Sequence, residues 1–311
     1  MRPKILISEF MDAPAVEALR AKFDVAYDAG LVDRPDELAA AVAGADVFIV
    51  RNRTQVKGVL LDACKQVKVI GRLGVGLDNI DVATCKSRGI EVIPATGANA
   101  LAVAEYVIGA AMILLRGAYA SSQAVADGKW PRNALSNGRE TAGKTLGLIG
   151  FGGIGQLSAQ LARGLGMRVV AHDPLIPAGA SVWKAQETSP ATLDELLAQS
   201  DVVSLHVPLI ETTKNLINAA RLGQMKANAV LINTARGGIV DEAALVNALK
   251  SGRLGGAALD VFDAEPLPAG NVFAGCPNVL LTPHIAGVTA ESNERVSSMI
   301  AERVTEFLLQ A

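Results

Sequence analysis

The chain has 311 residues, a length typical of about two domains, and its 29 basic and 31 acidic side chains leave a net charge of −2. This balance excludes a strong basic field, so we expect neither nucleic acid nor an anionic membrane as a partner. Half of the residues are hydrophobic but only 4% are aromatic, so the core must be built from Ala, Val, Leu and Ile. Such a core suits parallel sheets that are buried on both faces.

The cysteines argue against a metal site or a disulfide framework. Cys64, Cys85 and Cys276 are widely spaced, odd in number and form no CxxC pair. Reduced thiols in a cytoplasmic protein explain this usage most simply. The apolar run at the N-terminus, Ile5–Ile7, is too short for a signal peptide and predicts a first strand.

Short apolar strands alternate with amphipathic helices in the first part of the chain. We expect strands at Ile5–Ile7, Val25–Tyr27, Val47–Val50, Val67–Ile70 and Ile90–Ile93. Helical patterns lie between them, at Pro14–Lys22, Pro35–Ala43, Gly58–Ala63 and Val82–Arg88. This alternation predicts parallel strands joined by right-handed crossovers.

The longest apolar stretch, residues 98–115, separates this series from a second one. Glu105 interrupts it and it is short for a bilayer span, so we expect a buried helix with Asn99 as its N-cap. A polar stretch at 127–143 follows it. The strands expected next are Thr145–Ile149, Val169–His172, Val202–His206, Val230–Asn233, Ala257–Val261 and Val279–Thr282, before a closing helix at Glu291–Leu309.

The second series begins a sheet of its own, so the first sheet is expected to be a separate unit. No strand follows the closing helix, which leaves it able to return to the first sheet. We therefore expect one domain from residues 1–98 and 288–311 and another from residues 99–287.

A glycine-rich turn directly follows the expected strand Thr145–Ile149. Gly150-Phe151-Gly152-Gly153-Ile154-Gly155 matches GxGxxG and opens an amphipathic helix. The first glycine permits a tight turn, the second lets a pyrophosphate approach the backbone, and the third lets helix and strand pack closely. The helix N-terminus offers N–H groups and a partial positive charge to phosphates. The expected contacts are Gly150, Gly152, Gly153, Ile154 and Gly155.

An acidic residue, Asp173, ends the next expected strand. A dinucleotide-binding fold places a carboxylate there to accept hydrogen bonds from the adenosine ribose diol. Because this charge would repel a 2′-phosphate, we expect NAD as the cofactor rather than NADP. The alternative is an exposed acid in the turn before Pro174.

Three charged residues stand at or just past strand ends in the second series: Arg236, Glu265 and His284. Open α/β sheets bind ligands at such ends. A guanidinium can bind a carboxylate and polarise a carbonyl, histidine can exchange a proton near neutral pH, and a carboxylate beside the imidazole stabilises its protonated form. Each residue alone has a structural or solvated alternative, so the three residues indicate this chemistry only as a set.

Together these motifs resemble the D-isomer-specific 2-hydroxyacid dehydrogenase family over nearly the whole chain. The matching segments are Gly74–Asp81, Gly150–Gly155 with Asp173, Asn233–Gly238, Ala258–Phe262, Glu265-Pro266 and Thr282–His284. The resemblance implies an α/β architecture of two doubly wound parallel-sheet domains with a cleft between them. One is a flavodoxin-like substrate domain and the other a Rossmann NAD-binding domain, and the family assembles as a homodimer.

The resemblance also implies roles for individual residues. Arg236 would orient the substrate, His284 would be the acid/base, and Glu265 would be its partner. Formate dehydrogenases of this superfamily typically carry Gln at the Glu265 position, which disfavours formate. Asp260 would contact the nicotinamide carboxamide. The other implied cofactor contacts are His206, Val207 and Pro208 near the adenine, and Thr234, Ala235 and Gly287.

The first domain offers candidate substrate-binding groups. The N–H groups of Gly74-Val75-Gly76 can form a nest for the substrate carboxylate, unless this is a plain tight turn. Arg51-Asn52-Arg53 follows the strand Val47–Val50, where two arginines can bind a phosphate or sulfonate on carbon 3. The alternative is that one arginine is solvated or paired with a carboxylate. Asn99 can add a donor, although capping alone would explain it.

We therefore expect an NAD-dependent enzyme that interconverts a D-2-hydroxy acid and its 2-keto acid. A second anionic group on carbon 3, as in 3-phosphoglycerate or 3-sulfolactate, is the leading substrate class. Glyoxylate or hydroxypyruvate reductase and D-lactate dehydrogenase are alternatives, and an NAD-sensing binding protein of the same fold is a remote one. Because the sequence stops at Ala311, serine control through a C-terminal regulatory domain is not expected.

Overall fold

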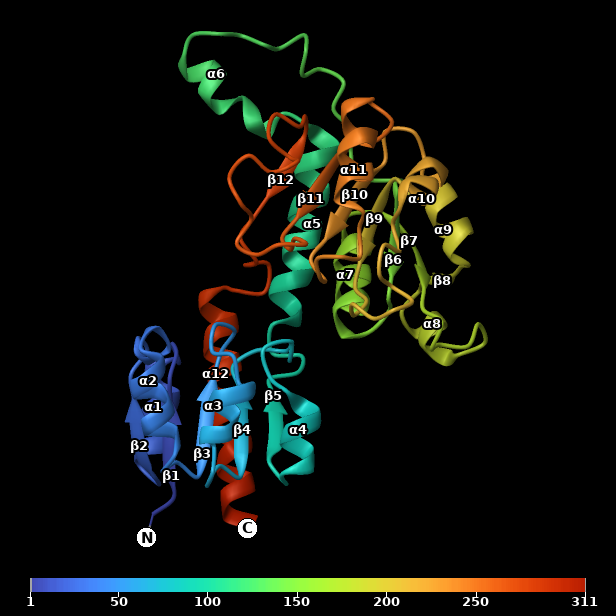
Figure 1. Cartoon of the computed structure of the whole chain (residues 1–311). Coiled ribbons are helices and arrows are strands. Elements are labelled where there is room, and N and C mark those ends of the chain that lie inside the picture. The colour runs from blue at the N-terminus through green and yellow to red at the C-terminus, as the bar shows by residue number, and fades with distance from the viewer. Residues whose placement is uncertain (1, 311) are drawn as a thin grey trace. The chain divides into compact units, whose positions relative to one another are not determined.

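The computed structural model describes residues 2–310. The chain forms two compact units: unit 1 comprises Met1–Asn99 and Val288–Ala311, and unit 2 comprises Ala100–Gly287. Each unit contains one parallel sheet and its helices (Figure 1). The expected α/β class with two parallel sheets is confirmed.

Unit 1 is built on a five-stranded sheet in the order β2-β1-β3-β4-β5, with every pairing parallel. Its strands are β1 Lys4–Ile7, β2 Asp24–Tyr27, β3 Val47–Val50, β4 Val69–Arg72 and β5 Glu91–Pro94. Its helices are α1 Ala13–Arg20, α2 Pro35–Val42, α3 Gly58–Ala63, α4 Val82–Ser87 and α12 Ala290–Gln310, with a 3-10 turn at Leu31–Asp33. The strand order reverses between β1 and β3, and ligands bind at such a switch point in open parallel sheets.

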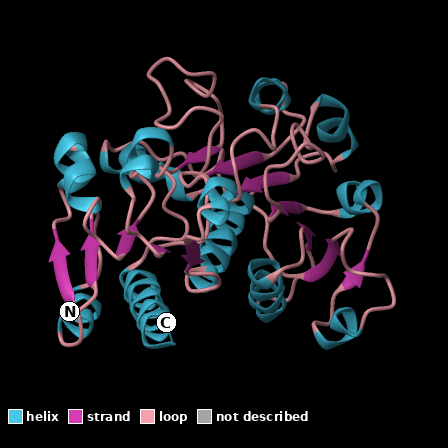
Figure 2. Ribbon diagram, turned by 60° about the horizontal axis from the view of Figure 1, so that its bottom comes forward, coloured by secondary structure: helices cyan, strands magenta, loops and turns pink. Residues whose placement is uncertain are grey.

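The last helix of the chain completes the core of unit 1. Ile300 and Val304 of α12 are fully buried and belong to one apolar cluster with Ile5, Ile7 and Ile49 of the sheet. Figure 2 shows helices on both sides of the strands around the N-terminus, with the C-terminal helix among them. The end of the sequence is therefore part of the same unit as its beginning.

Unit 2 is built on a seven-stranded parallel sheet in the order β12-β11-β10-β9-β6-β7-β8. Its strands are β6 Thr145–Ile149, β7 Arg168–His172, β8 Ser189–Pro190, β9 Val202–Leu205, β10 Val230–Asn233, β11 Gly256–Leu259 and β12 Val279–Leu281. Its helices are α5 Ala100–Arg116, α6 Ser122–Ala126, α7 Gly153–Gly164, α8 Ser181–Ala185, α9 Leu193–Gln199, α10 Ala219–Gln224 and α11 Glu242–Lys250, with a 3-10 turn at Tyr119–Ser121. Its switch point lies between β6 and β9.

Apolar strands explain why this sheet forms. All residues of β6, β9, β10 and β11 are buried. Separate apolar clusters cover the two faces of the sheet, as expected of a parallel sheet with helices on both sides. Both clusters consist mainly of aliphatic side chains, as the composition predicts.

A few local predictions are wrong. The fourth strand is Val69–Arg72 rather than Val67–Ile70. The sequence pattern does not predict the edge strand β8, because it has only two residues, both exposed. Asn99 does not cap α5, since its side-chain oxygen accepts no hydrogen bond among the described residues.

In residues 2–310, no single helix combines the length and apolar character needed to cross a bilayer. Within these residues, α5 and the 119–126 segment together have the length and composition of a membrane span, but the two are bent by 71° relative to each other.

Candidate active site

The glycine turn joins β6 to α7 at the switch point of unit 2. Gly150 has a φ of +94°, and a Cβ there would lie 2.4 Å from the carbonyl oxygen of His206. A Cβ at Gly155 would lie 2.6 Å from the Gly150 oxygen, so both positions need glycine. By contrast, nothing lies within 4 Å of a Cβ built at Gly152 or Gly153. The turn thus packs closely against neighbouring backbone at Gly150 and Gly155, whereas the space beside Gly152 and Gly153 is open.

Asp173 is fixed against this turn. Its carboxylate accepts hydrogen bonds from the N–H groups of Phe151 at 2.8 Å and Leu175 at 3.0 Å. The Gly150 N–H donates to the His172 carbonyl at 2.8 Å, which ties the turn to the end of β7. The negative charge of Asp173 therefore stands beside the turn, as the motif predicts.

His206 follows β9, on the other side of the turn. Its Nε2 lies 3.0 Å from the Ser204 hydroxyl. Burial lowers the pKa of His206 to about 4, so the imidazole is uncharged near neutral pH. Val207 lies close to the turn as well, 3.1 Å from a Cβ built at Gly150. The structure thus brings together the turn, Asp173 and the start of the segment His206–Pro208.

Arg236 lies in a loop after β10 that is held by its own strand and by the next loop. Asn233 donates from Nδ2 to the Arg236 carbonyl at 2.9 Å and accepts from the Ala235 N–H at 3.0 Å. A Cβ at Gly237 would lie only 1.9 Å from the Phe262 carbonyl oxygen, so the loops after β10 and β11 are in direct contact. Close by, the Thr234 hydroxyl oxygen is buried without a hydrogen-bond partner among the described residues.

His284 and Glu265 form a hydrogen-bonded pair. The imidazole Nδ1 lies 2.7 Å from Glu265 Oε2, and the side chains are 50% and 36% exposed. Glu265 Oε1 accepts a hydrogen bond from the Phe262 N–H at 3.0 Å, which orients the carboxylate. Because Glu265 engages Nδ1, Nε2 is the ring nitrogen left for proton exchange with another molecule.

Asp260 anchors the segment that carries His284, a role that sequence reasoning missed. The side chain is 1% exposed. Its carboxylate accepts hydrogen bonds from the Thr282 hydroxyl at 2.6 Å and from the N–H groups of Ile285 and Ala286, both at 2.8 Å. The Asp260 carbonyl also accepts from the His284 N–H at 2.9 Å. These bonds hold His284 at a φ of +55°, which a non-glycine residue adopts only when its surroundings fix it.

Arg236, Glu265 and His284 thus follow the ends of three neighbouring parallel strands, β10, β11 and β12. Glu265 and His284 meet directly, and the Arg236 loop contacts the loop of Glu265. A guanidinium, a carboxylate and an imidazole at one sheet edge suit binding of an anion and general acid–base chemistry. In residues 2–310, no group of three or more His, Cys, Asp or Glu is arranged to hold a metal ion.

The candidate substrate residues of unit 1 fall into two environments. Arg51 donates from Nη2 to Asn293 Oδ1 at 2.7 Å, and its Cζ lies 5.6 Å from the centroid of the Phe10 ring. Burial lowers the pKa of Arg51 and the nearby Glu9 carboxylate raises it, but a guanidinium stays charged in either case. Arg53 is exposed and ion-paired with Asp33, so the carboxylate-bound alternative holds for this residue.

Gly74-Val75-Gly76 follows β4, the strand next to β3. The Gly74 N–H donates to the Arg72 carbonyl at 2.8 Å. The Arg72 guanidinium lies over this turn, because a Cβ at Gly74 would be 1.5 Å from Arg72 Nη1. Sequence reasoning did not single out Arg72. The signal was its position at the end of β4, directly before the glycine-containing turn.

Comparison with known proteins agrees with these observations. A family model described as "D-isomer specific 2-hydroxyacid dehydrogenase, NAD binding domain" matches residues 108–286. The chain is 51% identical over 304 residues, 98% of each protein, to an (S)-sulfolactate dehydrogenase of Chromohalobacter salexigens. It is 38% identical over 99% of each chain to a hydroxypyruvate reductase of Thermotoga maritima.

A solved structure of the TT0316 protein from Thermus thermophilus superposes with a TM-score of 0.89 at 35% identity, covering 99% of this chain and 97% of the other. The family model lies within unit 2, whereas the relatives and the solved structure cover both units. The chain belongs to the D-isomer specific 2-hydroxyacid dehydrogenases and is an oxidoreductase that uses a nicotinamide dinucleotide.

Proposed function

We propose that the enzyme interconverts 3-sulfolactate and 3-sulfopyruvate with NAD as its cofactor. The observation that carries this proposal is the Arg51 guanidinium, which follows β3 at the switch point of unit 1. Its side-chain partners, the Asn293 amide and the Phe10 ring, are neutral and leave its charge available to a sulfonate. The 51% identity to an (S)-sulfolactate dehydrogenase supports the same substrate.

The stereochemical label of that relative agrees with a D-specific family. In 3-sulfolactate, the CH2–SO3⁻ group outranks the carboxylate, because sulfur outranks oxygen at the first point of difference. In D-lactate the carboxylate outranks the methyl group instead. The same spatial arrangement is therefore labelled R in lactate and S in sulfolactate, so (S)-sulfolactate has the D configuration.

The dinucleotide site proposed in unit 2 fits such a cofactor. The open backbone at Gly152 and Gly153 leaves room for a pyrophosphate, and the Thr234 hydroxyl, which has no partner within residues 2–310, offers a polar contact. The bound cofactor would supply the hydride acceptor for the alcohol. The residues proposed to hold it are Gly150, Gly152, Gly153, Ile154, Gly155, Asp173, His206, Val207, Pro208, Thr234, Ala235, Asp260 and Gly287.

The remaining residues act on the substrate. Arg236 binds the substrate carboxylate, and His284 Nε2 accepts the proton of the 2-hydroxyl during oxidation or returns it during reduction. Glu265 stabilises the imidazolium through Nδ1. In unit 1, which we propose as the substrate domain, the N–H groups of Val75 and Gly76 contribute to carboxylate binding and Arg51 binds the sulfonate, whereas the Gly74 N–H already donates to the Arg72 carbonyl.

Hydroxypyruvate reduction is the second candidate. It is favoured by the Asp33–Arg53 ion pair, which neutralises one of the two arginines expected to bind a doubly charged substrate. Hydroxypyruvate has a neutral hydroxyl on carbon 3 and needs no second cation. The identity to the Thermotoga maritima hydroxypyruvate reductase, at 38%, is lower.

The choice of NAD over NADP follows from Asp173. Two backbone N–H groups fix its carboxylate beside the glycine turn, where it would repel a 2′-phosphate. We expect a kcat/KM for NADH at least about tenfold above that for NADPH, equivalent to about 1.4 kcal/mol. Replacing Asp173 by Asn should lower the ratio of kcat/KM for NADH to kcat/KM for NADPH. A wild-type enzyme that uses both cofactors equally would refute the assignment.

A homodimer is proposed from the apolar surface of unit 2. Trp130 is 77% exposed and Tyr119 is 60% exposed, in the segment after α5. Met112 and Ile113 of α5 are also partly exposed. These exposed apolar side chains lie within one segment of the chain, and exposed apolar surface suits a protein–protein contact. The family resemblance implies that the partner is a second copy of the chain.

Sedimentation velocity tests this assembly. The wild-type enzyme should sediment as a dimer, and Trp130→Asp should shift it towards the monomer because a charge would be buried at the interface. Leu175→Asp is the matched control, since Leu175 is an exposed apolar residue of unit 2 outside this segment. A monomeric wild type, or equal effects of both substitutions, would contradict the proposal.

The Arg51→Ala variant tests whether the substrate carries a second anionic group on carbon 3. Loss of a charge-assisted hydrogen bond costs about 1.5–3 kcal/mol, so KM for 3-sulfopyruvate should rise about 10- to 100-fold. KM for glyoxylate, which lacks the second anionic group, should change little. Arg53→Ala is the matched control and should have a smaller effect, because Asp33 already occupies its guanidinium. Equal changes for both substrates in Arg51→Ala would instead favour a reductase of small 2-keto acids.

A further inference from the structure

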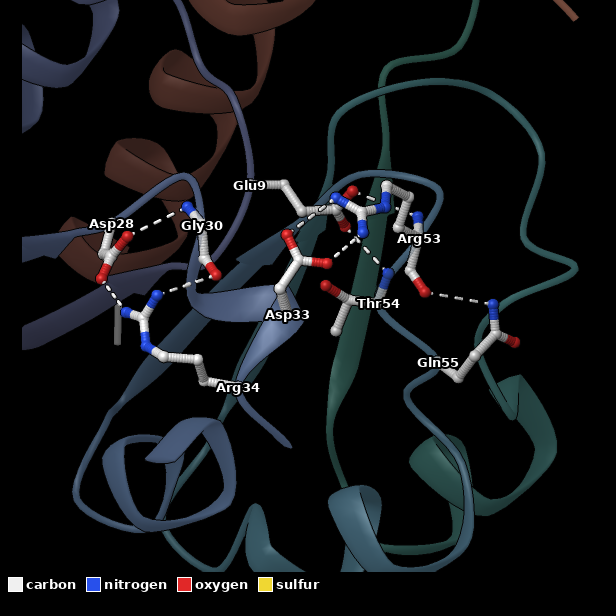
Figure 3. Close-up of polar contacts among 8 residues, drawn as sticks. All are labelled: Glu9, Asp28, Gly30, Asp33, Arg34, Arg53, Thr54 and Gln55. Carbon is white, nitrogen blue, oxygen red and sulfur yellow. Dashed lines mark hydrogen bonds and ion pairs between the residues drawn. The ribbon is translucent and has the colours of Figure 1, made fainter. Parts of the chain in front are cut away.

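The buried carboxylate of Glu9 organises the segment 51–54. Glu9 lies two residues after the end of β1, and it is 3% exposed. It accepts hydrogen bonds from the N–H groups of Arg51 at 2.8 Å, Arg53 at 3.1 Å and Thr54 at 3.0 Å. Figure 3 shows the carboxylate beside Arg53 and Thr54. A buried carboxylate is tolerated only when such donors compensate its lost hydration.

Asn79 holds the same segment from its carbonyl side. This side chain is 5% exposed, and its Nδ2 donates to the carbonyls of Arg51 at 3.0 Å and Thr54 at 2.7 Å. The Ser8 and Thr54 hydroxyls add a buried contact at 3.2 Å. The backbone of 51–54 is therefore fixed on its donor and acceptor sides by residues from two other loops.

This arrangement determines how the edge of the sheet can bind an anion. The N–H groups of Arg51, Arg53 and Thr54 are already used by Glu9, so they are not available as a backbone nest for a ligand. Of the two guanidiniums in this segment, that of Arg53 is paired with the Asp33 carboxylate, whereas that of Arg51 is bonded to the neutral Asn293 amide. Arg51 is therefore the better anion ligand of the two, and the direction of its guanidinium depends on the backbone from which it projects. Glu9 and Arg51 flank the β1–β3 switch point, where an open sheet places its ligand.

We propose that Glu9 is a positioning residue for substrate selection: by fixing the backbone of residues 51–54, it aims the Arg51 guanidinium at the second anionic group of the substrate. The inference rests on the proposed function, in which Arg51 binds that group. Glu9 itself does not contact the substrate. If Glu9 acts by aiming Arg51, its effect on substrate binding vanishes when Arg51 is absent.

Glu9→Gln is the informative substitution. Gln keeps one acceptor oxygen, which can serve the N–H groups of Arg51 and Thr54, but its NH2 group cannot accept from Arg53. KM for 3-sulfopyruvate should rise about tenfold, the equivalent of about 1.4 kcal/mol, while kcat and the KM for glyoxylate change little. Asp46→Asn is the control, because Asp46 bonds the Lys4 N–H at the opposite end of the same strands.

A double-mutant cycle separates positioning from general damage. In the Arg51→Ala background, Glu9→Gln should cause no further rise in KM for 3-sulfopyruvate. If Glu9→Gln does not fold, Asn79→Ala replaces it and carries the same expectation. The inference would be overturned if the two substitutions raised KM for 3-sulfopyruvate additively, or if Glu9→Gln raised KM for glyoxylate equally. In either case Arg51→Ala alone would still separate 3-sulfopyruvate from glyoxylate, and the proposed function would stand. If Arg51→Ala itself fails to discriminate, the proposed function falls, and the inference falls with it.

Discussion

The carboxylate of Asp260 is buried at the end of β11 and accepts three hydrogen bonds from the segment that carries His284. The geometry of the candidate active site depends on this interaction. Without those three bonds, a buried charge would remain uncompensated, and the segment would lose the contacts that hold His284 in a left-handed conformation. The imidazole would then lose its fixed position beside Glu265.

In unit 1, a buried carboxylate fixes a neighbouring loop in the same way. Glu9 is also buried, also follows a strand and also accepts three hydrogen bonds from a neighbouring loop. In both units the parallel sheet brings the loops to one edge, and a carboxylate then fixes the loop that carries the charged side chain. We infer that the sheets determine where the sites lie, whereas the buried carboxylates determine how the side chains of His284 and Arg51 are oriented.

The sequence predicts the α/β class and two parallel sheets, because these depend on local patterns of apolar residues and glycines. The same patterns place Gly150–Gly155, Glu265 and His284 after strands, whereas the roles proposed for these residues rest on the family resemblance. It did not reveal the anchoring roles of Asp260 and Glu9. Each of these roles depends on contacts between loops far apart in the chain, which no periodicity records. For the same reason, the sequence does not show which arginine of 51–53 is paired with a carboxylate; the structure pairs Arg53 with Asp33. The failure of Asn99 to cap α5 shows that residue type alone does not establish a bond.

We propose that the imidazole of His284, aligned by Glu265, exchanges the proton of the substrate hydroxyl. The direct measurement is turnover of His284→Gln with 3-sulfopyruvate and NADH, alongside NADH binding followed by fluorescence. We expect kcat to fall about 10²- to 10⁴-fold, the usual contribution of a general acid–base group, with NADH binding nearly unchanged. Turnover close to that of the wild type, with NADH bound normally, would contradict the account.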